Sequence, residues 1–357
     1  VYGSDATAGV INIITRKDFE GAEANVYIGQ WGQGDGQRDV YDFTMGFRGD
    51  RGSLTAGVEY TNEDPVWARN RWFSRARFPT GEKTDPRPGG LSGTTEFGRF
   101  AYTNAAGGTS TRTLRRDVAG LDPADFSSYR ALNGTDTSNP SLASTVYSGI
   151  KRKSAFLNGH FDFTDNVAFD TSVLYTDRES FAQNAGYPMQ SANFDLSSGG
   201  LSIDSVFNPL GNQATGTLPA GVAPQAVQYV RRGWEVPREV QNNLTTSRFT
   251  GKFSGNFNFG EKYWDWEAGF LYNQNKGTQI STGNLNTYAV GQATGPSFIN
   301  SEGVAQCGTA ANPITLGSGP GACTPWNPLV PFGYNAPNGL NDPNVQAYLY
   351  QPGQALS

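Results

Sequence analysis

Residues on which most enzyme and metal sites depend are scarce in this sequence. Among its 357 residues are one histidine, two cysteines and two methionines. With His160 as the only histidine, a two-histidine metal motif cannot form, and no Gly-x-Ser-x-Gly segment suggests a Ser-His-Asp triad. The spacing of the Asp and Glu residues picks out no acid–base pair. We therefore expect a protein that is not an enzyme and has no metal or cofactor site.

An excess of positive charge and long apolar runs are also missing. The formal net charge is -5 and the pI is about 5.1, so the basic footprint of a nucleic-acid-binding protein is absent. No apolar run approaches the roughly 18 to 20 residues of a membrane-spanning helix. These absences exclude a nucleic-acid partner and a helical membrane protein.

Glycine and aromatic residues are abundant instead, with 45 Gly, 22 Phe, 16 Tyr and 7 Trp. At a mean hydropathy of -0.49, this composition is typical of many strands whose two faces meet different surroundings. Apolar and polar side chains alternate with the period of a β-strand, as where Phe43 and Met45 alternate with Asp42 and Thr44. The segments that alternate in this way are 22–30, 40–49, 53–62, 151–163, 167–181, 244–259 and 263–281.

The apolar sides of these segments favour a membrane environment over a soluble sandwich. They contain no charge at their centres, and several segments exceed the roughly 9 to 11 residues that cross a bilayer at a tilt. Aromatic ends such as Phe259, Tyr263 and Trp264 suit the membrane interface. His160 lies on a polar side, and we interpret it as a hydrated wall residue rather than a ligand contact. The sequence thus predicts an all-β fold, a transmembrane antiparallel β-barrel.

The connections between the segments alternate between short and long. Tight turns are expected at 49–52, 164–166 and 260–262, and the glycine-rich segment 31–37 is expected to be a hairpin tip. Long loops are expected at 63–150, 182–243 and 282–357, as on the outer rim of a barrel. Asp122-Pro123 and Asp342-Pro343 predict short helices over 123–132 and 343–350.

Seven strands are too few to close a membrane barrel. Bacterial single-chain barrels have an even number of strands, eight or more. An open sheet would leave unpaired backbone amides in hydrocarbon, at a cost of several kcal/mol each. We therefore expect further strands after residue 357 and further chain before residue 1.

The first seventeen residues, VYGSDATAGVINIITRK, resemble the end of the plug domain of TonB-dependent outer-membrane receptors. Ala8 departs from the family pattern, which often has a second glycine there. A second resemblance, to large receptors of xanthomonads, caulobacters and sphingomonads, lies in SVFNPLG (205–211) and CTPWNPLVPFG (323–333). The residues that match the plug motif include Tyr2, Gly3, Ser4, Gly9 and Asn12.

The resemblance implies that 1–17 ends a plug and that 18–357 begins a barrel of about 22 strands. It implies energised import of a scarce ligand, an oligosaccharide or a ferric siderophore, across the bacterial outer membrane. The implied partners are outer-membrane lipid, lipopolysaccharide, and the TonB-ExbB-ExbD complex, which acts through an N-terminal box outside this chain.

Two groups of loop residues are candidate site residues. Arginines beside an aromatic ring suit acidic or sugar ligands, although the same cluster is also explained by a solvated loop or by contact with lipopolysaccharide. Cys307 and Cys323 are expected to form a disulfide that holds a loop, rather than a thiol pair or a metal site. The residues of the arginine cluster are Arg69, Arg71, Trp72, Arg75 and Arg77.

Two other hypotheses remain. A passive porin-type or adhesin barrel has the same strands but no plug-like segment before them. A soluble β enzyme would stay in solution without detergent, whereas a barrel would fractionate with outer membranes.

Overall fold

A computed structural model describes residues 19–75, 91–194 and 199–350, and its chain divides into two compact units. Unit 1 contains one large antiparallel sheet, and unit 2 contains smaller sheets around a hydrophobic core. The fold is therefore mostly β, as expected. Among the described residues no helix is long and apolar enough to cross a membrane.

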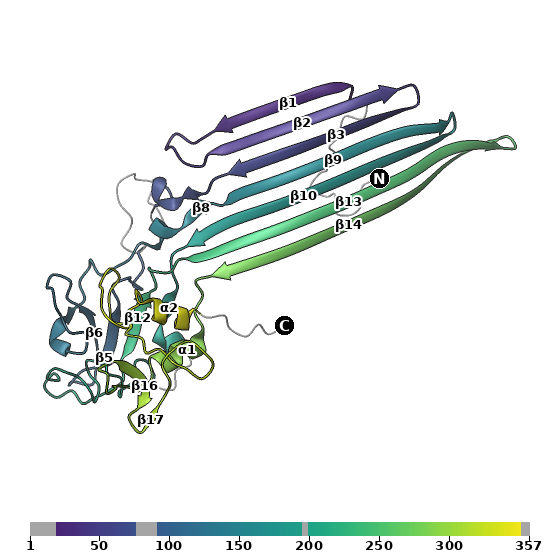
Figure 1. Ribbon diagram of the computed structural model, residues 1–357. Helices are drawn as coiled ribbons and strands as arrows, with labels where there is room; N and C mark the ends of the chain where they lie inside the picture. Colours follow the sequence, from purple (N-terminus) through teal and green to yellow (C-terminus); the bar gives the residue numbers. More distant parts are fainter. Residues whose placement is uncertain (1–18, 76–90, 195–198, 351–357) are drawn as a thin grey trace. The chain divides into compact units, whose positions relative to one another are not determined.

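The large sheet has seven strands in the order β1-β2-β3-β9-β10-β13-β14 (Figure 1). Each predicted alternating segment corresponds to one of them, with ends that differ by only a few residues. The strands are β1 (Gly21–Gly29), β2 (Arg38–Gly49), β3 (Gly52–Glu63), β9 (Gly149–Thr164), β10 (Val167–Asn184), β13 (Arg238–Phe259) and β14 (Lys262–Thr282).

The register of the large sheet aligns side chains of one kind across neighbouring strands. Phe43 lies opposite Ala24 on one side and Val58 on the other. Val58 lies opposite Ala155, which in turn lies opposite Tyr175. Because side chains of a strand alternate between faces, this row places every second residue of five strands on one face.

The turns and long connections leave the large sheet at opposite ends. Short turns join β2 to β3, β9 to β10 and β13 to β14. Gly260 in the last turn has a φ of +64°, a left-handed conformation that favours glycine. The long connections follow β3, β10 and β14 at the other end of the sheet, hereafter the loop end. The expected alternation of short and long connections is confirmed.

The long connections contain more regular structure than the sequence indicated. They form unit 2, whose main sheet has the order β11-β12-β5-β6-β7. Its strands are β5 (Arg99–Thr103), β6 (Thr109–Leu114), β7 (Tyr129–Ala131), β11 (Pro188–Gln190) and β12 (Gln228–Arg232). The remaining elements are β4 (Val66–Trp67) paired with β8 (Thr145–Tyr147), β15 (Ser297–Ile299), β16 (Ala305–Thr309), β17 (Asn312–Pro313), α1 (Thr287–Ala293), α2 (Pro343–Leu349), and the 3-10 helices η2 (Ala68–Asn70), η4 (Phe126–Ser128), η5 (Pro140–Ala143) and η6 (Ser191–Asn193).

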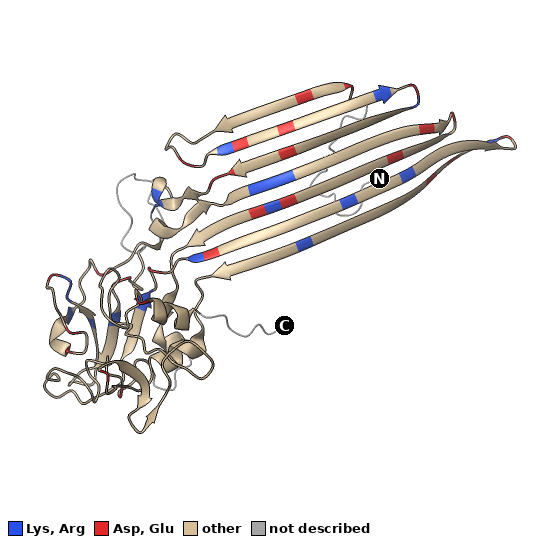
Figure 2. Cartoon of the chain, in the orientation of Figure 1, with Lys and Arg blue, Asp and Glu red and all other residues tan. Residues whose placement is uncertain are grey.

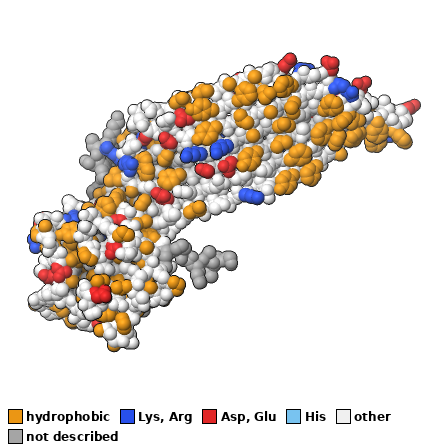
Figure 3. All heavy atoms as spheres, viewed as in Figure 1, with side chains coloured by type: hydrophobic (Ala, Val, Ile, Leu, Met, Phe, Trp, Pro, Cys, Tyr) orange, Lys and Arg blue, Asp and Glu red, His pale blue; other side chains and the backbone are white. Residues whose placement is uncertain are grey.

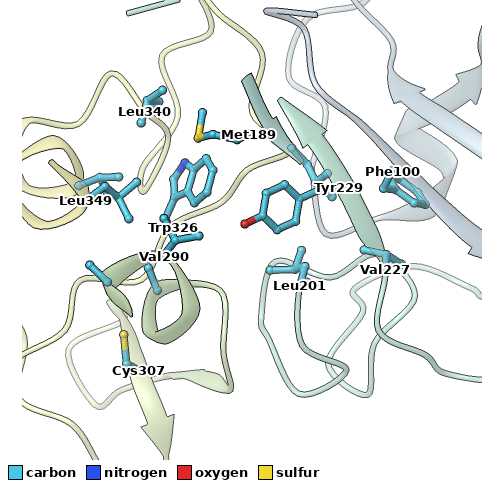
Figure 4. Close-up of a cluster of buried hydrophobic side chains, with 14 of the residues drawn as sticks. Phe100, Met189, Leu201, Val227, Tyr229, Val290, Cys307, Trp326, Leu340 and Leu349 are labelled. Carbon is cyan, nitrogen blue, oxygen red and sulfur yellow. The ribbon is translucent and has the colours of Figure 1, made fainter. Parts of the chain in front are cut away.

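The hydrophobic core of unit 2 draws side chains from all three long connections (Figure 4). Trp326 and Tyr229 are fully buried and meet edge to face, with ring centroids 5.5 Å apart. Phe100, Met189 and Leu349 belong to the same cluster. Burial of such large side chains stabilises the unit by about 1.5–3 kcal/mol each.

Asx-Pro pairs shape the irregular segments of unit 2. In both Asn-Pro-Leu sequences the Asn side chain accepts a hydrogen bond from the backbone N–H of the Leu, at 2.9 Å for Asn208 and 3.0 Å for Asn327. Proline has no N–H, so the side chain takes the next donor along the chain. Leu210 and Leu329 are thereby turned into the core, where both are almost fully buried. Both motifs therefore have a structural role.

One of the two predicted helices is confirmed and the other is wrong. α2 begins after Asp342, whose carboxylate accepts from Asn344 N at 2.8 Å. The segment 123–132 instead contains η4 followed by β7. Asp125 accepts from Ser127 N there and starts a separate short turn, and Tyr129 then pairs with β6. Pairing with a neighbouring strand outweighs the local helix signal.

We predict that Gly255 in β13 does not tolerate a side chain. A Cβ there would lie 2.7 Å from the carbonyl oxygen of Asn166 and 2.7 Å from atoms of the Trp266 ring. The variant Gly255→Ala is expected to lower the free energy of unfolding by about 1–3 kcal/mol in denaturant titrations, because a backbone atom cannot yield. The control Gly277→Ala in β14 meets nothing closer than 3.8 Å. Equal effects of the two variants would contradict the prediction.

Candidate functional site: the two faces of the large sheet

One face of the large sheet consists almost entirely of apolar side chains that are exposed. Val26 is 67% exposed, Phe270 63% and Phe259 76%, and no other layer of described residues covers them. Figure 3 shows hydrophobic side chains spread over the strands of the sheet. We name this surface the apolar face. Its exposed members include Val26, Ile28, Phe43, Phe47, Leu54, Val58, Phe161, Phe163, Val173, Phe249, Phe253, Phe257, Phe259, Trp264 and Phe270.

Aromatic residues gather near both ends of the apolar face. Toward the loop end, Tyr41 and Tyr60 stack with ring centroids 6.4 Å apart. Toward the short turns, Phe163 contacts Phe161 and Phe253, with centroids 5.1 and 6.0 Å away. Trp264 is on the same face beside its own turn and is half exposed. Between the two zones lie aliphatic residues such as Ala24, Val58 and Ala155, together with further aromatic residues such as Phe43.

On the apolar face of β9 and β10, charges begin level with the tyrosines toward the loop end, where Lys153 lies opposite Tyr60. Lys153 lies opposite Asp177, and Lys151 lies opposite Glu179. Figure 2 shows these charges as a band across β9 and β10. From 155 to 163 in β9 the same face is uncharged, a length close to the roughly 9–11 residues of a membrane-crossing strand.

The opposite face of the large sheet, hereafter the polar face, has paired charges and amides. Asn25 donates from Nδ2 to Asp42 at 3.0 Å, and Arg152 forms an ion pair with Glu59. These groups are partly exposed, so each pair stabilises the sheet by at most about 1 kcal/mol. Their main effect is to make this face wettable along its whole length.

His160 belongs to a chain of charges that crosses four strands of the polar face. Its Nδ1 is 2.9 Å from Asp170 Oδ1, and Lys252 Nζ lies 4.0 Å from the other oxygen of Asp170. Lys252 also pairs with Glu267 at 2.9 Å. Alternation alone placed His160 on this face correctly, but the pairing with Asp170 depends on the register of β9 and β10. His160 thus takes part in the side-chain pairing across the polar face of the sheet.

A hollow of about 460 Å³ opens on the polar face. Its lining combines polar and charged groups, Arg248 among them, with the apolar residues Phe19, Phe156, Val173 and Leu174. The polar residues that line it include Glu23, Asn25, Asp42, Thr44, Asn158 and Ser172.

The residues of the predicted arginine cluster do not converge on one site, and most of them make separate contacts with neighbouring parts of the chain. Arg69 stacks on the ring of Trp67 at 4.4 Å and donates to the Leu142 carbonyl. Arg71 is buried. Trp72 is half exposed and meets Phe73 edge to face. The backbone oxygen of Arg75 accepts from Asn139, at 2.6 Å.

Ligand contact by this cluster stays a prediction. Arg77 lies outside the described residues, as do Tyr2, Gly3, Ser4, Gly9 and Asn12 of the plug-like motif. No group of three or more His, Cys, Asp or Glu residues in the described part of the chain is placed to hold a metal ion.

Comparison of the chain with known protein families, characterised proteins and solved structures finds no match to any of them.

Cys307 and Cys323 form the predicted disulfide, with Cα atoms 6.1 Å apart. Both are 1% exposed and belong to the core of unit 2. We predict that the double variant Cys307→Ser, Cys323→Ser lowers the free energy of unfolding of unit 2 by about 3 kcal/mol, because the unfolded loop is no longer closed. Thermal unfolding followed by near-UV circular dichroism measures this loss. An unchanged midpoint would show that the disulfide does not stabilise the unit.

Proposed function

We propose that this chain is part of a bacterial outer-membrane β-barrel, in which the large sheet forms a stretch of the wall. The observation that supports this most is the apolar face. Soluble monomers rarely expose contiguous apolar surface above roughly a few hundred Å², and here seven adjacent strands expose apolar side chains together. Lipid on that side removes the cost of contact with water.

The distribution of residue types along the strands supports the same proposal. Aromatic side chains prefer the membrane–water interface, and a charge near the middle of the lipid face costs about 2–4 kcal/mol. On the apolar face, the aromatic zones flank an uncharged centre, and the Lys–Asp and Lys–Glu pairs lie outside it. The polar face then lines a wet interior.

The proposal requires strands beyond those described. Within the described residues, β1 and β14 are the edges of the sheet. Each unpaired backbone group in hydrocarbon would cost several kcal/mol. In a closed barrel, additional strands pair with both edges.

We further propose that the barrel is a TonB-dependent receptor rather than an enzyme. The support is the resemblance of 1–17 to the end of a plug domain and of the two Asn-Pro loops to large receptors. Such a receptor imports a scarce ligand, an oligosaccharide or a ferric siderophore, with energy from the TonB-ExbB-ExbD complex. A passive porin-type or adhesin barrel is the alternative, and it offers no role for a plug-like segment.

The lipid-facing assignment is tested by two neighbouring residues of β2. Phe43 is on the apolar face in the uncharged row, and Thr44 lines the hollow on the polar face beside Asp42. We expect Phe43→Arg to reduce outer-membrane assembly and to lower stability in detergent by about 2–4 kcal/mol. Thr44→Arg is expected to assemble normally, because it enters a wet, acidic surface.

Phe43→Leu is the matched control, since it changes size but adds no charge. Assembly is measured by fractionation of outer membranes and by resistance of the folded band to heat on gels. If Thr44→Arg impaired assembly as strongly as Phe43→Arg, or if the intact protein remained in solution without detergent, the barrel proposal would be wrong.

Energised transport is tested separately by uptake. Cells that express the intact protein are expected to accumulate its labelled ligand only with a working ExbB and a proton gradient. An oligosaccharide pool and a set of ferric siderophores serve as candidate ligands. Uptake that persists without ExbB would favour the passive barrel, while leaving the wall assignment in place.

A further inference from the structure

Three arginines surround an open hollow in unit 2 that none of the sequence motifs includes. The hollow has a volume of about 590 Å³ and is lined by Arg115, Arg116, Asp117, Tyr129 and Arg130. All five residues belong to unit 2: three directly follow β6, and Tyr129 and Arg130 begin β7. The concentration of guanidinium groups is unusual in a chain with a net charge of -5.

Pairing of two strands holds these side chains in place. Leu114 lies opposite Tyr129 and Thr113 lies opposite Arg130. The backbone N–H of Arg115 donates to the Ser128 carbonyl at 3.0 Å, which extends the pairing past the end of β6. The arginines on the two strands are therefore adjacent because of the register.

The carboxylate of Asp136 holds two of the arginine side chains in position by accepting hydrogen bonds from both. Arg130 makes a two-pronged contact with it, at 2.7 and 2.8 Å, and Arg116 donates to it at 3.0 Å. The backbone N–H of Asn133 donates to the same carboxylate at 2.7 Å. The hydrogen bonds from Arg130, with those from Asn133 and Arg116, outweigh burial and lower the pKa of Asp136 to about 2. The carboxylate is thus ionised at neutral pH and accepts hydrogen bonds at both oxygens.

Arg116 is fixed from a second direction as well. Its guanidinium carbon lies 3.8 Å from the centre of the Phe97 ring, so the planar group stacks on the aromatic face. Its Nη1 is buried without an acceptor among the described residues. A buried donor without a partner costs about as much as a lost hydrogen bond, which a bound acceptor would recover.

The positive charge around the hollow exceeds what the carboxylates balance. Within the described part of the chain, the carboxylates beside the three guanidinium groups are those of Asp117 and Asp136. Among the described residues the Arg115 side chain has no hydrogen-bond or ion-pair partner. Arg116 and Arg130 are held rigidly, while Arg115 is available.

We propose that this hollow is a binding site for an oxyanion, a carboxylate or phosphate group on a small soluble molecule. Planar guanidinium groups in fixed orientations bind such groups through paired, charge-assisted hydrogen bonds. Arg116 and Arg130 would bind the anion with side chains that are already held in position, and Arg115 would donate further hydrogen bonds to it. The proposal concerns unit 2 alone and does not depend on the transport function.

The test is isothermal titration calorimetry on the purified intact protein with inorganic phosphate, with citrate and, as a neutral probe, with glucose. We expect phosphate or citrate to bind with a dissociation constant on the order of 1 mM or tighter, and glucose not to bind. Arg115→Ala is expected to weaken binding by about tenfold, because one charged hydrogen-bond donor is lost. Arg115→Lys retains the charge without the planar fork and is expected to have an intermediate effect.

Arg112→Ala is the matched control. Arg112 is in the same strand β6, lies over the Phe126 ring at 5.9 Å, and does not line the hollow. Its loss is expected to leave anion binding unchanged, and circular dichroism verifies that each variant is folded. Equal weakening by Arg112→Ala and Arg115→Ala would overturn the proposal, since it would indicate a nonspecific charge effect. So would a wild-type protein that binds phosphatidylglycerol vesicles but neither soluble anion.

Discussion

The large sheet depends on the alternation of side chains between the two faces of a β-strand. Because all seven strands are in register, one face receives Ala24, Phe43, Val58, Ala155 and Tyr175 in a single row, while the other receives the acids, amides and basic groups. A slip of one residue in a strand would place its polar side chains in an apolar row and its apolar side chains on the polar face. The register of the strands therefore decides which residue types each face presents, and these determine whether that face favours water or an apolar environment.

This constraint explains why the large sheet was predictable and unit 2 was not. A long strand between two different surroundings repeats its signal over many residues, so 167–181 already identified β10 (Val167–Asn184). Strands of unit 2 such as β7 (Tyr129–Ala131) are too short to show a period. Its core also joins Phe100, Met189 and Trp326 from three separate connections, and no local pattern records such distant pairing.

The Asn-Pro motifs show how a sequence resemblance can have a physical origin. Asn208 and Asn327 each bond to the amide two residues on and turn the following leucine into the core. A proline that fixes the backbone, a side chain that replaces its missing donor and a leucine to bury form a compact folding device. Because the motif acts in folding, it determines how a loop is built and does not by itself identify a ligand.

Arginines that are close together in the sequence do not necessarily form a binding site. The segment 69–77 attracted attention because its arginines are close in sequence, yet Arg69 stacks on Trp67 and Arg71 is buried. Arg115 and Arg116 directly follow β6 and Arg130 lies in β7, so only the pairing of β6 with β7 brings the three together. The second group differs because Asp136 orients the guanidinium groups of Arg116 and Arg130. The side chain of Arg115 has no such partner among the described residues. An anion site requires such an unsatisfied charge, and it is the fold that decides which charge remains unsatisfied.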